Sequence, residues 1–371
     1  MKKDNAVKSN HRVLFLHKAF SLDGGVERVH KNLSSALAQQ GVSSIFYVND
    51  VSDCQADGYE SLAKDFSAFR ADYHAKQTKK IRYLFNLIKS ESVTVIISAT
   101  ETANMLAFFC KLRFPALKVI FTRHCAFDVS DQKLSPWAIK ALYTLYSLAN
   151  GSVVAVSDQL REEIAKSVLV GKRRVDFIPN AVLQPVIGTL ADDAPSIPLP
   201  EKYFCSVGRL VEQKGFDLLI KAYHKALDLR PSLPDLVIVG EGEDRCELES
   251  LASRLNIKHK VHLPGFNSNP YSIVKRAEIF ILSSRHEGMP TVLVESIFLN
   301  TPVIAFDCPT GPRELVTSEE VGALIPAENI DRLADAIAQY DELLINDLSI
   351  SEYVKNFSYE NVAKAYISKF C

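Results

Sequence analysis

The chain alternates short apolar runs with longer amphipathic segments along most of its length. Residues 12–17, 93–99 and 118–123 are rich in valine, isoleucine, leucine and phenylalanine, and each run is followed by residues with apolar side chains at helical spacing. Continuous apolar strands that alternate with helices are typical of parallel sheets whose two faces are both covered. The pattern predicts an α/β protein built from doubly wound, Rossmann-like sheets.

A proline-rich segment interrupts this alternation. Residues 184–200 contain four prolines and no clear periodicity, and the strand–helix pattern restarts after them. A length of 371 residues suits two domains better than one. We therefore expect an N-terminal domain over residues 1–185, a C-terminal domain over residues 186–354, and an interdomain linker where the prolines are found.

Composition indicates a soluble protein of the cytoplasm. The N-terminal residues 1–12 are polar and lack the apolar core of a signal peptide, and no apolar run approaches the length of a membrane span. The seven cysteines are odd in number and include no CxxC pair, which argues against a disulfide framework or a structural zinc ion.

Charge is distributed unevenly between the two halves. Residues 1–190 contain 25 lysines and arginines against 17 aspartates and glutamates, whereas residues 191–371 contain 18 against 27. A basic first half suggests an anionic partner, such as the inner face of the plasma membrane or a phosphorylated acceptor. A mildly basic solvated face explains the same asymmetry equally well.

Residues 279–299 read as strand, tight loop and helix. The apolar run 279–282 is followed by a turn at Gly288 and Pro290, and residues 291–299 have helical spacing. The free N–H groups and dipole of a helix start attract an anion such as phosphate. Glu287 in the loop and Glu295 in the helix would repel a phosphate, so we expect them to bind hydroxyl groups nearby. Phosphate together with hydroxyls describes a nucleotide sugar.

The start of the second domain adds two cations. Arg209 and Lys214 follow the apolar strand that begins this domain. An arginine is a two-pronged donor that suits a diphosphate, and stabilising a leaving diphosphate is the main electrostatic need when a glycosyl–phosphate bond breaks. Gly24 and Gly25, between the first strand and its helix, would let the backbone approach a ligand closely.

These segments resemble a known enzyme family. Glu287 and Glu295, separated by seven residues in EGMPTVLVE, are similar to the EX7E motif of retaining glycosyltransferases, above all glycosyltransferase family 4. The segments GGVE (24–27), GRL with KG (208–215) and GEG (240–242) resemble further elements of that family. The resemblance implies the GT-B fold, in which two Rossmann-like domains face across a cleft and a last helix, here residues 355–371, packs back on the first domain.

The resemblance also implies an activity and a set of site residues. It implies transfer of a hexose or N-acetylhexosamine, with retention, from a nucleotide sugar such as a UDP-sugar to a hydroxyl of a glycan or lipid-linked acceptor. Such reactions build cell-surface polysaccharides, including lipopolysaccharide and capsule. The implied catalytic residues are Glu287, His124, Arg209 and Lys214. The implied substrate-binding residues are Gly24, Gly25, Gly208, Gly240, Gly288, Met289, Pro290, Thr291, Glu295 and Gly311.

The sequence predicts no metal and no other cofactor. It contains no DxD pair of aspartates, and the cations at Arg209 and Lys214 with the helix start near Thr291 can neutralise a diphosphate. A nucleotide-sugar epimerase on the same fold and an inactive sugar-binding subunit remain alternatives. A dinucleotide-dependent dehydrogenase fits poorly, because Arg245 stands where the third glycine of its fingerprint belongs. We expect no nucleic-acid partner.

Overall fold

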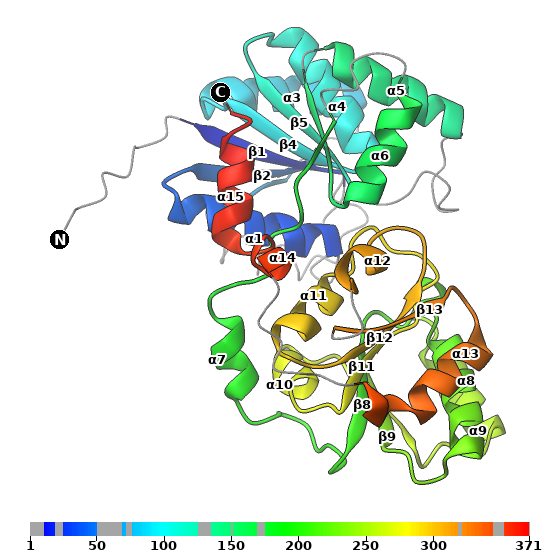
Figure 1. The fold of residues 1–371 in the computed structure, drawn as a ribbon. Helices are drawn as coiled ribbons and strands as arrows, with labels where there is room; N and C mark the ends of the chain where they lie inside the picture. Colours follow the sequence, from blue (N-terminus) through cyan, green and yellow to red (C-terminus); the bar gives the residue numbers. More distant parts are fainter. Residues whose placement is uncertain are drawn as a thin grey trace. The chain divides into compact units, whose positions relative to one another are not determined.

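Two parallel sheets organise the protein, one in each half of the chain (Figure 1). The computed structural model describes residues 11–18, 25–49, 69–71, 76–124, 135–149, 151–168, 175–317, 321–343 and 352–370. Every strand pair within these residues is parallel. The predicted α/β class with two Rossmann-like sheets is therefore confirmed.

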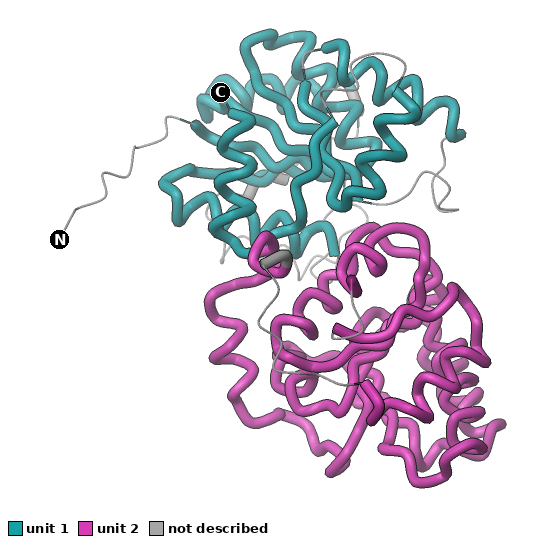
Figure 2. The backbone as a smooth tube through the Cα atoms, in the orientation of Figure 1, with its two compact units in different colours: residues 1–181, 358–371 teal, residues 182–357 magenta. Residues whose placement is uncertain are grey.

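The chain divides into two compact units (Figure 2). Unit 1 contains residues 1–181 and 358–371, and unit 2 contains residues 182–357. The last helix, α15 (Tyr359–Ile367), belongs to unit 1 and packs on α1 (Gly25–Gln39). Val362 and Tyr366 of α15 are buried in the same cluster as Leu33 of α1, so the end of the chain completes the core of its first part.

Unit 1 has a seven-stranded sheet in the order β3-β2-β1-β4-β5-β6-β7. Its strands are β1 (Arg12–His17), β2 (Ser43–Val48), β3 (Phe69–Ala71), β4 (Val95–Ala99), β5 (Lys118–Arg123), β6 (Ser152–Ala155) and β7 (Val175–Phe177). Besides α1 and α15, its helices are α3 (Gln77–Ser90), α4 (Glu101–Arg113), α5 (Pro136–Leu148) and α6 (Asp158–Ser167).

Unit 2 has a six-stranded sheet in the order β10-β9-β8-β11-β12-β13. Its strands are β8 (Tyr203–Val207), β9 (Asp235–Val239), β10 (Val261–Gly265), β11 (Ile279–Leu282), β12 (Val303–Asp307) and β13 (Gly322–Pro326). Its helices are α7 (Ile187–Asp192), α8 (Phe216–Leu229), α9 (Arg245–Arg254), α10 (Tyr271–Val274), α11 (Thr291–Phe298), α12 (Pro312–Leu315), α13 (Ile330–Ala338) and α14 (Glu352–Lys355), with 3-10 turns η2 (Glu212–Lys214) and η3 (Tyr340–Glu342).

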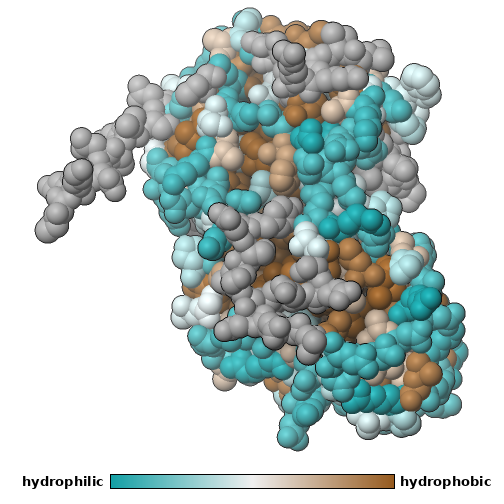
Figure 3. All heavy atoms as spheres, in the orientation of Figure 1, coloured by the Kyte–Doolittle hydropathy of each residue, from teal (hydrophilic) through white to brown (hydrophobic). Residues whose placement is uncertain are grey.

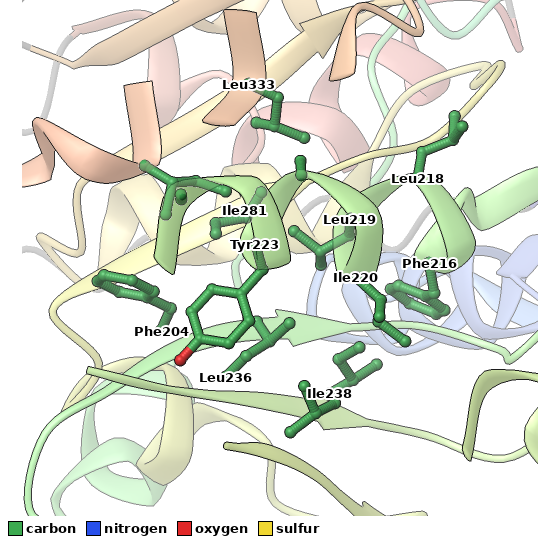
Figure 4. Close-up of a cluster of buried hydrophobic side chains, with 14 of the residues drawn as sticks. Phe204, Phe216, Leu218, Leu219, Ile220, Tyr223, Leu236, Ile238, Ile281 and Leu333 are labelled. Atoms are coloured by element: carbon green, nitrogen blue, oxygen red, sulfur yellow. The ribbon is translucent and has the colours of Figure 1, made fainter. Parts of the chain in front are cut away.

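The core of unit 2 shows why its sequence folds this way (Figure 4). Phe216, Leu219, Ile220 and Tyr223 repeat at helical spacing along α8 and are buried against the sheet. Burying a side chain of this size contributes roughly 1.5–3 kcal/mol. The Tyr223 hydroxyl donates to the carbonyl oxygen of Pro234 at 2.7 Å, so its polar end is satisfied inside the core.

The proline-rich segment at residues 184–200 belongs to unit 2. Residues 187–192 form helix α7, which packs on α10. The sequence pattern of this helix is weak, because the helix has only two buried side chains, Ile187 and Ala191, one turn apart. Asn269 fixes the segment further by donating to the Leu190 carbonyl oxygen at 2.8 Å. The segment that was expected to link the two domains therefore contains a helix and belongs to unit 2.

Each sheet has one point where the strand order reverses. In unit 1 the chain leaves β1 toward β2 and later returns to pair β4 on the other side of β1; in unit 2 the same happens at β8, between β9 and β11. Loops at the carboxyl ends of such strands diverge and leave room for a ligand. The described helices include none that is both long and apolar enough to cross a bilayer.

Candidate functional site

The predicted motifs of unit 2 gather at the carboxyl ends of β8 and β11. Gly208 directly follows β8, and the loop from Ser283 to Pro290 directly follows β11. Because these two strands are neighbours at the reversal point, segments about 70 residues apart in the sequence meet there. The meeting is direct, since Ser283 Oγ donates to the Lys214 carbonyl oxygen at 3.0 Å.

A partly buried ion pair lies at the centre of this site. Lys214 Nζ is 2.7 Å from Glu287 Oε1, and Ser284 Oγ donates to the same carboxylate oxygen at 2.6 Å. The Glu287 side chain is 7% exposed and that of Lys214 is 18% exposed. A carboxylate so deeply buried needs a paired cation and hydrogen-bond donors to stay ionised. Two residues that the sequence assigned to separate roles are therefore partners in the structure.

The loop around Glu287 is held by its backbone. The Glu287 N–H donates to the Pro309 carbonyl oxygen at 3.3 Å, and Thr310 Oγ1 donates to the Glu287 carbonyl oxygen. Gly311 has φ of +96°, and a Cβ there would lie 2.6 Å from Pro290 Cδ. The loop that contains Gly311 can therefore pack against the loop from Ser283 to Pro290 only with glycine at position 311. This requirement comes from packing within the protein and does not depend on a ligand.

Arg285 anchors the same loop from the other side, and sequence reasoning missed it. Its guanidinium forms a two-pronged ion pair with Asp217, at 2.9 and 3.0 Å, and donates to the Glu212 carbonyl oxygen at 2.6 Å. These contacts fasten η2, which ends at Lys214, to the loop that carries Glu287. The only signal was an arginine two residues before Glu287, which on its own indicates no partner.

Arg209 is placed differently from Lys214. Its side chain is exposed and has no hydrogen-bond or ion-pair partner in the part of the chain that the structure describes. Gly208 beside it is also open: a Cβ at that position would come no closer than 3.4 Å to Phe216 and 3.5 Å to Lys214, which are ordinary contacts. Gly240, in contrast, must be glycine, since its Cβ would lie 1.9 Å from the Gly208 carbonyl oxygen.

Helix α11 begins directly after this loop. Pro290 is its N-cap residue and no side chain caps the first turn, so N–H groups of that turn remain unpaired within the helix. Thr291 opens the helix, and Gly288 and Met289 precede Pro290 in buried positions. Glu295 lies further along and is only 4% exposed. The two glutamates of the EX7E spacing therefore occupy distinct surroundings, one in the paired loop and one inside the helix.

Unit 1 brings three histidines together at the carboxyl end of its sheet. His17 ends β1, His30 lies in α1, and His124 follows β5. His30 Nδ1 is 3.0 Å from His17 Nε2, and the rings of His30 and His124 have centroids 5.9 Å apart. The sequence indicated only His124. The other two become evident only in the folded structure, where β1 and α1 bring His17 and His30, 13 positions apart in the sequence, into contact.

These histidines are electrically neutral at ordinary pH. Burial, with a contribution from neighbouring His124, lowers the pKa of His17 to about 3. Burial and the nearby Arg123 guanidinium lower the pKa of His124 to about 4. Burial, reinforced by His17 and His124, holds the pKa of His30 well below its ordinary value. The cluster offers hydrogen-bonding groups rather than positive charge.

Thr122 fixes which nitrogen of His124 carries the proton. Thr122 Oγ1 donates to the Ser98 carbonyl oxygen at 2.7 Å and also lies 2.9 Å from His124 Nε2. A hydroxyl has one proton, so the contact with the ring must be donated by His124 Nε2–H. Nδ1 of the neutral ring is then the unprotonated nitrogen, and it can accept a proton or a hydrogen bond.

A buried polar network supports the strand that carries Thr122. Asn104 accepts from Ser98 Oγ at 2.7 Å and donates to the Thr122 carbonyl oxygen at 3.2 Å. Next to it, Arg123 Nη1 lies 2.5 Å from Glu101 Oε1, which also accepts from the Tyr143 hydroxyl at 2.8 Å. Networks of this kind stabilise one arrangement of the side chains they connect.

The glycine pair of unit 1 is only partly described. Gly24 lies outside the described residues, and Gly25 is the exposed first residue of α1 with no atom within 4 Å of an added Cβ. Among the described residues, no group of three or more histidine, cysteine, aspartate or glutamate side chains is arranged to hold a metal ion.

Comparison with known proteins assigns both halves of the chain. Residues 23–182 match the family described as Glycosyltransferase Family 4, and residues 190–357 match the family described as Glycosyl transferases group 1. Each half of the chain is therefore similar to a glycosyltransferase domain. The fold that was expected from the resemblance, GT-B, is confirmed by solved glycosyltransferase structures that superpose over nearly the whole chain.

Three relatives show what kind of glycosyltransferase the chain is similar to. A Campylobacter jejuni N-acetylgalactosamine-N,N'-diacetylbacillosaminyl-diphospho-undecaprenol 4-alpha-N-acetylgalactosaminyltransferase is 36% identical, over 45% of this chain and 44% of that protein. An uncharacterized glycosyltransferase of Haemophilus influenzae is 28% identical over 87% of both chains. An Escherichia coli UDP-Gal:alpha-D-GlcNAc-diphosphoundecaprenol alpha-1,3-galactosyltransferase is 26% identical over 74% of this chain and 73% of that protein. The chain thus spans less than half the length of the Campylobacter relative.

Two solved structures show the same fold at low identity. A glycosyltransferase from Rickettsia africae superposes with a TM-score of 0.79 at 17% identity and covers 98% of both chains. The pneumococcal O-GlcNAc transferase GtfA, in complex with UDP and GlcNAc, superposes with a TM-score of 0.75 at 13% identity, over 98% of this chain and 99% of that one.

Proposed function

We propose that the protein transfers a hexose or N-acetylhexosamine from a UDP-sugar to a hydroxyl of a lipid-linked glycan, with retention of configuration at the sugar carbon. The observation that supports this best is the Lys214–Glu287 pair at the strand reversal of unit 2, next to the start of α11. The place is where doubly wound sheets bind ligands, and the groups there suit a diphosphate and a sugar.

The cations of unit 2 take the diphosphate. Arg209 is exposed and has no protein partner among the described residues, so it is available to a ligand without breaking an existing ion pair. Lys214 is held in place by Glu287 and donates from the other side. The helix start at Thr291 adds backbone N–H groups. The open space at Gly208 supports a bound phosphate there, since packing within the protein does not require glycine at that position.

The two glutamates bind different hydroxyls of the donor. Glu287, in the loop, contacts the sugar, while Glu295, inside α11, accepts from the hydroxyls of the ribose. In the transfer, the bond from the sugar carbon to the phosphate oxygen breaks and a bond to the acceptor oxygen forms. The acceptor proton passes to the leaving phosphate oxygen, so that UDP is released. The positions of the partly buried ion pair and of the uncapped helix start support this division of roles.

Unit 1 contributes a neutral acceptor group to the reaction. His124, fixed by Thr122 with its proton on Nε2, offers Nδ1 to a sugar hydroxyl. We propose a glycan on a diphospho-lipid as the acceptor, because the names of two relatives contain such a lipid. The protein would then work at the inner face of the plasma membrane, on polysaccharides such as lipopolysaccharide or capsule. No metal is required, because Arg209 and Lys214 neutralise the diphosphate.

The test is nucleotide release from a panel of UDP- and GDP-sugars, with and without an undecaprenyl-diphosphate glycan, in buffer containing EDTA. We expect UDP release that depends on the acceptor and persists in EDTA, with a product whose anomeric proton coupling by NMR matches that of the donor. Sugar conversion without nucleotide release would identify an epimerase. Binding of a donor without turnover would identify a sugar-binding subunit. Loss of activity in EDTA, restored by Mn²⁺, would refute the metal-free mechanism.

A further inference from the structure

Three neighbouring helices of unit 1 carry an excess of positive charge. Helices α3, α4 and α5 together contain seven lysines and arginines and one carboxylate, Glu101. That carboxylate is paired with the buried Arg123, so it does not offset the surface charge. Lys80 and Lys111 are buried and donate to backbone carbonyl oxygens, at 2.6 Å for Lys80, so they contribute less to the surface. The remaining five cations are Lys79, Arg82, Lys89, Arg113 and Lys140.

The same helices expose large apolar side chains. Apolar atoms are visible on the surface of both units (Figure 3). The most exposed large apolar side chains belong mainly to α4 and α5. Of the nine large apolar side chains that are most exposed in the described residues, six belong to α4 and α5. Phe109 is 48% exposed and Leu112 is 59% exposed, and with Met105 they repeat at helical spacing on one side of α4. Such a concentration marks an interaction surface.

A groove between α3 and α4 joins the two properties (Figure 1 shows the helices side by side). It consists of two hollows, of about 310 and 380 Å³, which share Ile81, Phe85 and Arg113 as lining residues. The first hollow is also lined by cations, and the second by apolar side chains. The additional residues are Thr78, Arg82, Asn86, Lys89 and Phe114 in the first, and Phe109 and Leu112 in the second.

The cations at the groove are held against aromatic rings. Arg113 Cζ lies 5.2 Å and Lys89 Nζ 5.9 Å from the centre of the Phe114 ring. Phe85 meets the same ring edge to face, with centroids 5.6 Å apart. Long basic side chains that rest on apolar surface keep their charged ends at the polar boundary. This is the arrangement that a membrane surface requires, with charge at the level of the headgroups and apolar groups below it.

We propose that the α3–α4 face of unit 1 docks on the surface of an anionic phospholipid bilayer. Phe109 and Leu112 enter the boundary of the acyl chains, while Arg82, Lys89 and Arg113 contact phosphate groups of the lipid. Charge complementarity favours an anionic lipid, because the three helices carry five basic side chains outside the core and almost no exposed carboxylate. The inference deepens the proposed function, since a lipid-linked acceptor would be presented at the same surface.

The test is sedimentation of the full chain with vesicles that contain no glycan acceptor. Vesicles of phosphatidylcholine with phosphatidylglycerol should bind the protein, and vesicles of phosphatidylcholine alone should bind it at least tenfold more weakly. Salt should weaken the binding to the anionic vesicles, because ions screen surface charges. The double variant Phe109→Ser with Leu112→Ser should bind at least tenfold more weakly than the wild type. Lys89→Gln and Arg113→Gln should each lower binding by about fivefold.

A matched control changes two apolar residues of unit 2 that are more exposed than Phe109 and Leu112. Leu229 and Phe266 are 61% and 67% exposed, and Leu229→Ser with Phe266→Ser should leave vesicle binding within about twofold of the wild type. Thermal unfolding of each variant shows whether it folds. Equal binding of the wild type and the Phe109→Ser, Leu112→Ser variant refutes the proposal, as does equal binding to both vesicle types or binding to neither.

Failure of docking can be separated from failure of the proposed function. With a water-soluble acceptor lacking the lipid, the Phe109→Ser, Leu112→Ser variant should release nucleotide at the wild-type rate. Weak vesicle binding with full activity on that acceptor supports docking through this face. Activity of the wild type together with no vesicle binding overturns the docking proposal alone and leaves the transferase in place.

Discussion

The two units place different chemistry at the same end of the same kind of sheet. In unit 2, the carboxyl ends of β8 and β11 carry an ion pair, Lys214 with Glu287, and the exposed Arg209. In unit 1, the carboxyl ends of β1 and β5 carry His17 and His124, whose pKa values burial lowers far below neutrality. One sheet therefore presents ionised groups at its reversal point, and the other presents neutral hydrogen-bonding groups.

The proposed function gives the two units different tasks. A diphosphate needs fixed positive charge, and Lys214 of unit 2, held in place by Glu287, is proposed to provide it. A sugar hydroxyl needs a neutral acceptor with a defined lone pair, and His124 of unit 1, with its fixed tautomer, is proposed to provide that acceptor. We therefore expect substitutions at the cations of unit 2 to weaken the interaction with the diphosphate, and substitutions around His124 in unit 1 to lower turnover.

The largest effect is expected at Lys214. Lys214→Ala removes a charged hydrogen bond to the diphosphate, of about 1.5–3 kcal/mol, and leaves Glu287 buried without its cation. We expect kcat/KM to fall about 100-fold. Arg209→Ala should cost at least about tenfold, because the exposed guanidinium is more readily replaced by water. Steady-state kinetics with the donor found in the nucleotide screen provide the measurement.

A surface lysine of the same unit is the matched control for Lys214. Lys225 is exposed and paired with Asp331, and Lys225→Ala should keep kcat/KM within about twofold of the wild type. If kcat/KM falls by less than about threefold in folded Lys214→Ala, Lys214 has no part in the reaction. The contrast between a charged site in unit 2 and a neutral site in unit 1 would then lose its charged member.

The second effect separates the two glutamates of unit 2. Glu295→Gln should weaken binding of free UDP by about tenfold or more, because its carboxylate is proposed to accept from the ribose. Glu287→Gln should leave UDP affinity within about threefold and lower kcat, since only contacts that strengthen in the transition state raise turnover. Calorimetric titration of UDP beside steady-state rates gives both quantities. The opposite pattern would reverse the two roles.

A smaller effect, on turnover alone, is expected at Thr122 in unit 1. Thr122→Val keeps the shape of the side chain but removes the acceptor of His124 Nε2–H, so the ring can take either tautomer. We expect kcat to fall about tenfold with KM for the donor unchanged, while Thr122→Ser should restore most of the rate. The ¹⁵N chemical shifts of the His124 ring report the tautomer directly. A Thr122→Val enzyme with a single Nε2–H tautomer and a slow rate would mean that Thr122 acts only through folding.

The sequence predicted the parts of the molecule that are written in continuous segments. The apolar runs predicted parallel sheets, and the loop and helix from Glu287 to Glu295 were visible because their residues are adjacent in the chain. The contact between Lys214 and Glu287 was not visible, since it spans 73 residues and depends on the pairing of β8 with β11.

Other features could not be predicted because they depend on burial. Lys80 is one of the residues that make the first half of the sequence basic, yet it is buried and donates to the Asn49 carbonyl oxygen, so it adds little to a charged surface. Three further basic residues of that half, Lys172, Arg173 and Arg174, lie outside the described residues. Arg285 and His30 looked ordinary in the sequence, since their significance comes from partners on other elements.

The smallest expected effect is the response of turnover to mild acid. His124 must be neutral to accept through Nδ1, and its pKa is lowered to about 4 by burial and by Arg123. About 97% of the ring is then still neutral at pH 5.5, whereas a histidine with the ordinary pKa of about 6.5 would be only about 9% neutral. Between pH 7.5 and pH 5.5, kcat should therefore change less than about twofold and fall only as the pH approaches 4.

Stability must be followed in the same experiment, because the lowered pKa values also affect folding. The unfolded chain takes up protons on His17 and His124 near pH 6.5, while the folded chain does not until about pH 4 or below. Their contribution to stability is complete above pH 6.5 and is lost as the pH falls toward 4, by about 1.4 kcal/mol per pH unit for each histidine. Near-ultraviolet circular dichroism at each pH shows whether the enzyme is still folded. A fall in kcat with a midpoint near pH 6.5 in fully folded enzyme, absent from a His124→Gln variant, would show that His124 titrates like a free histidine. Unit 1 would then carry charge at its site as unit 2 does, and the contrast between the two units would not hold.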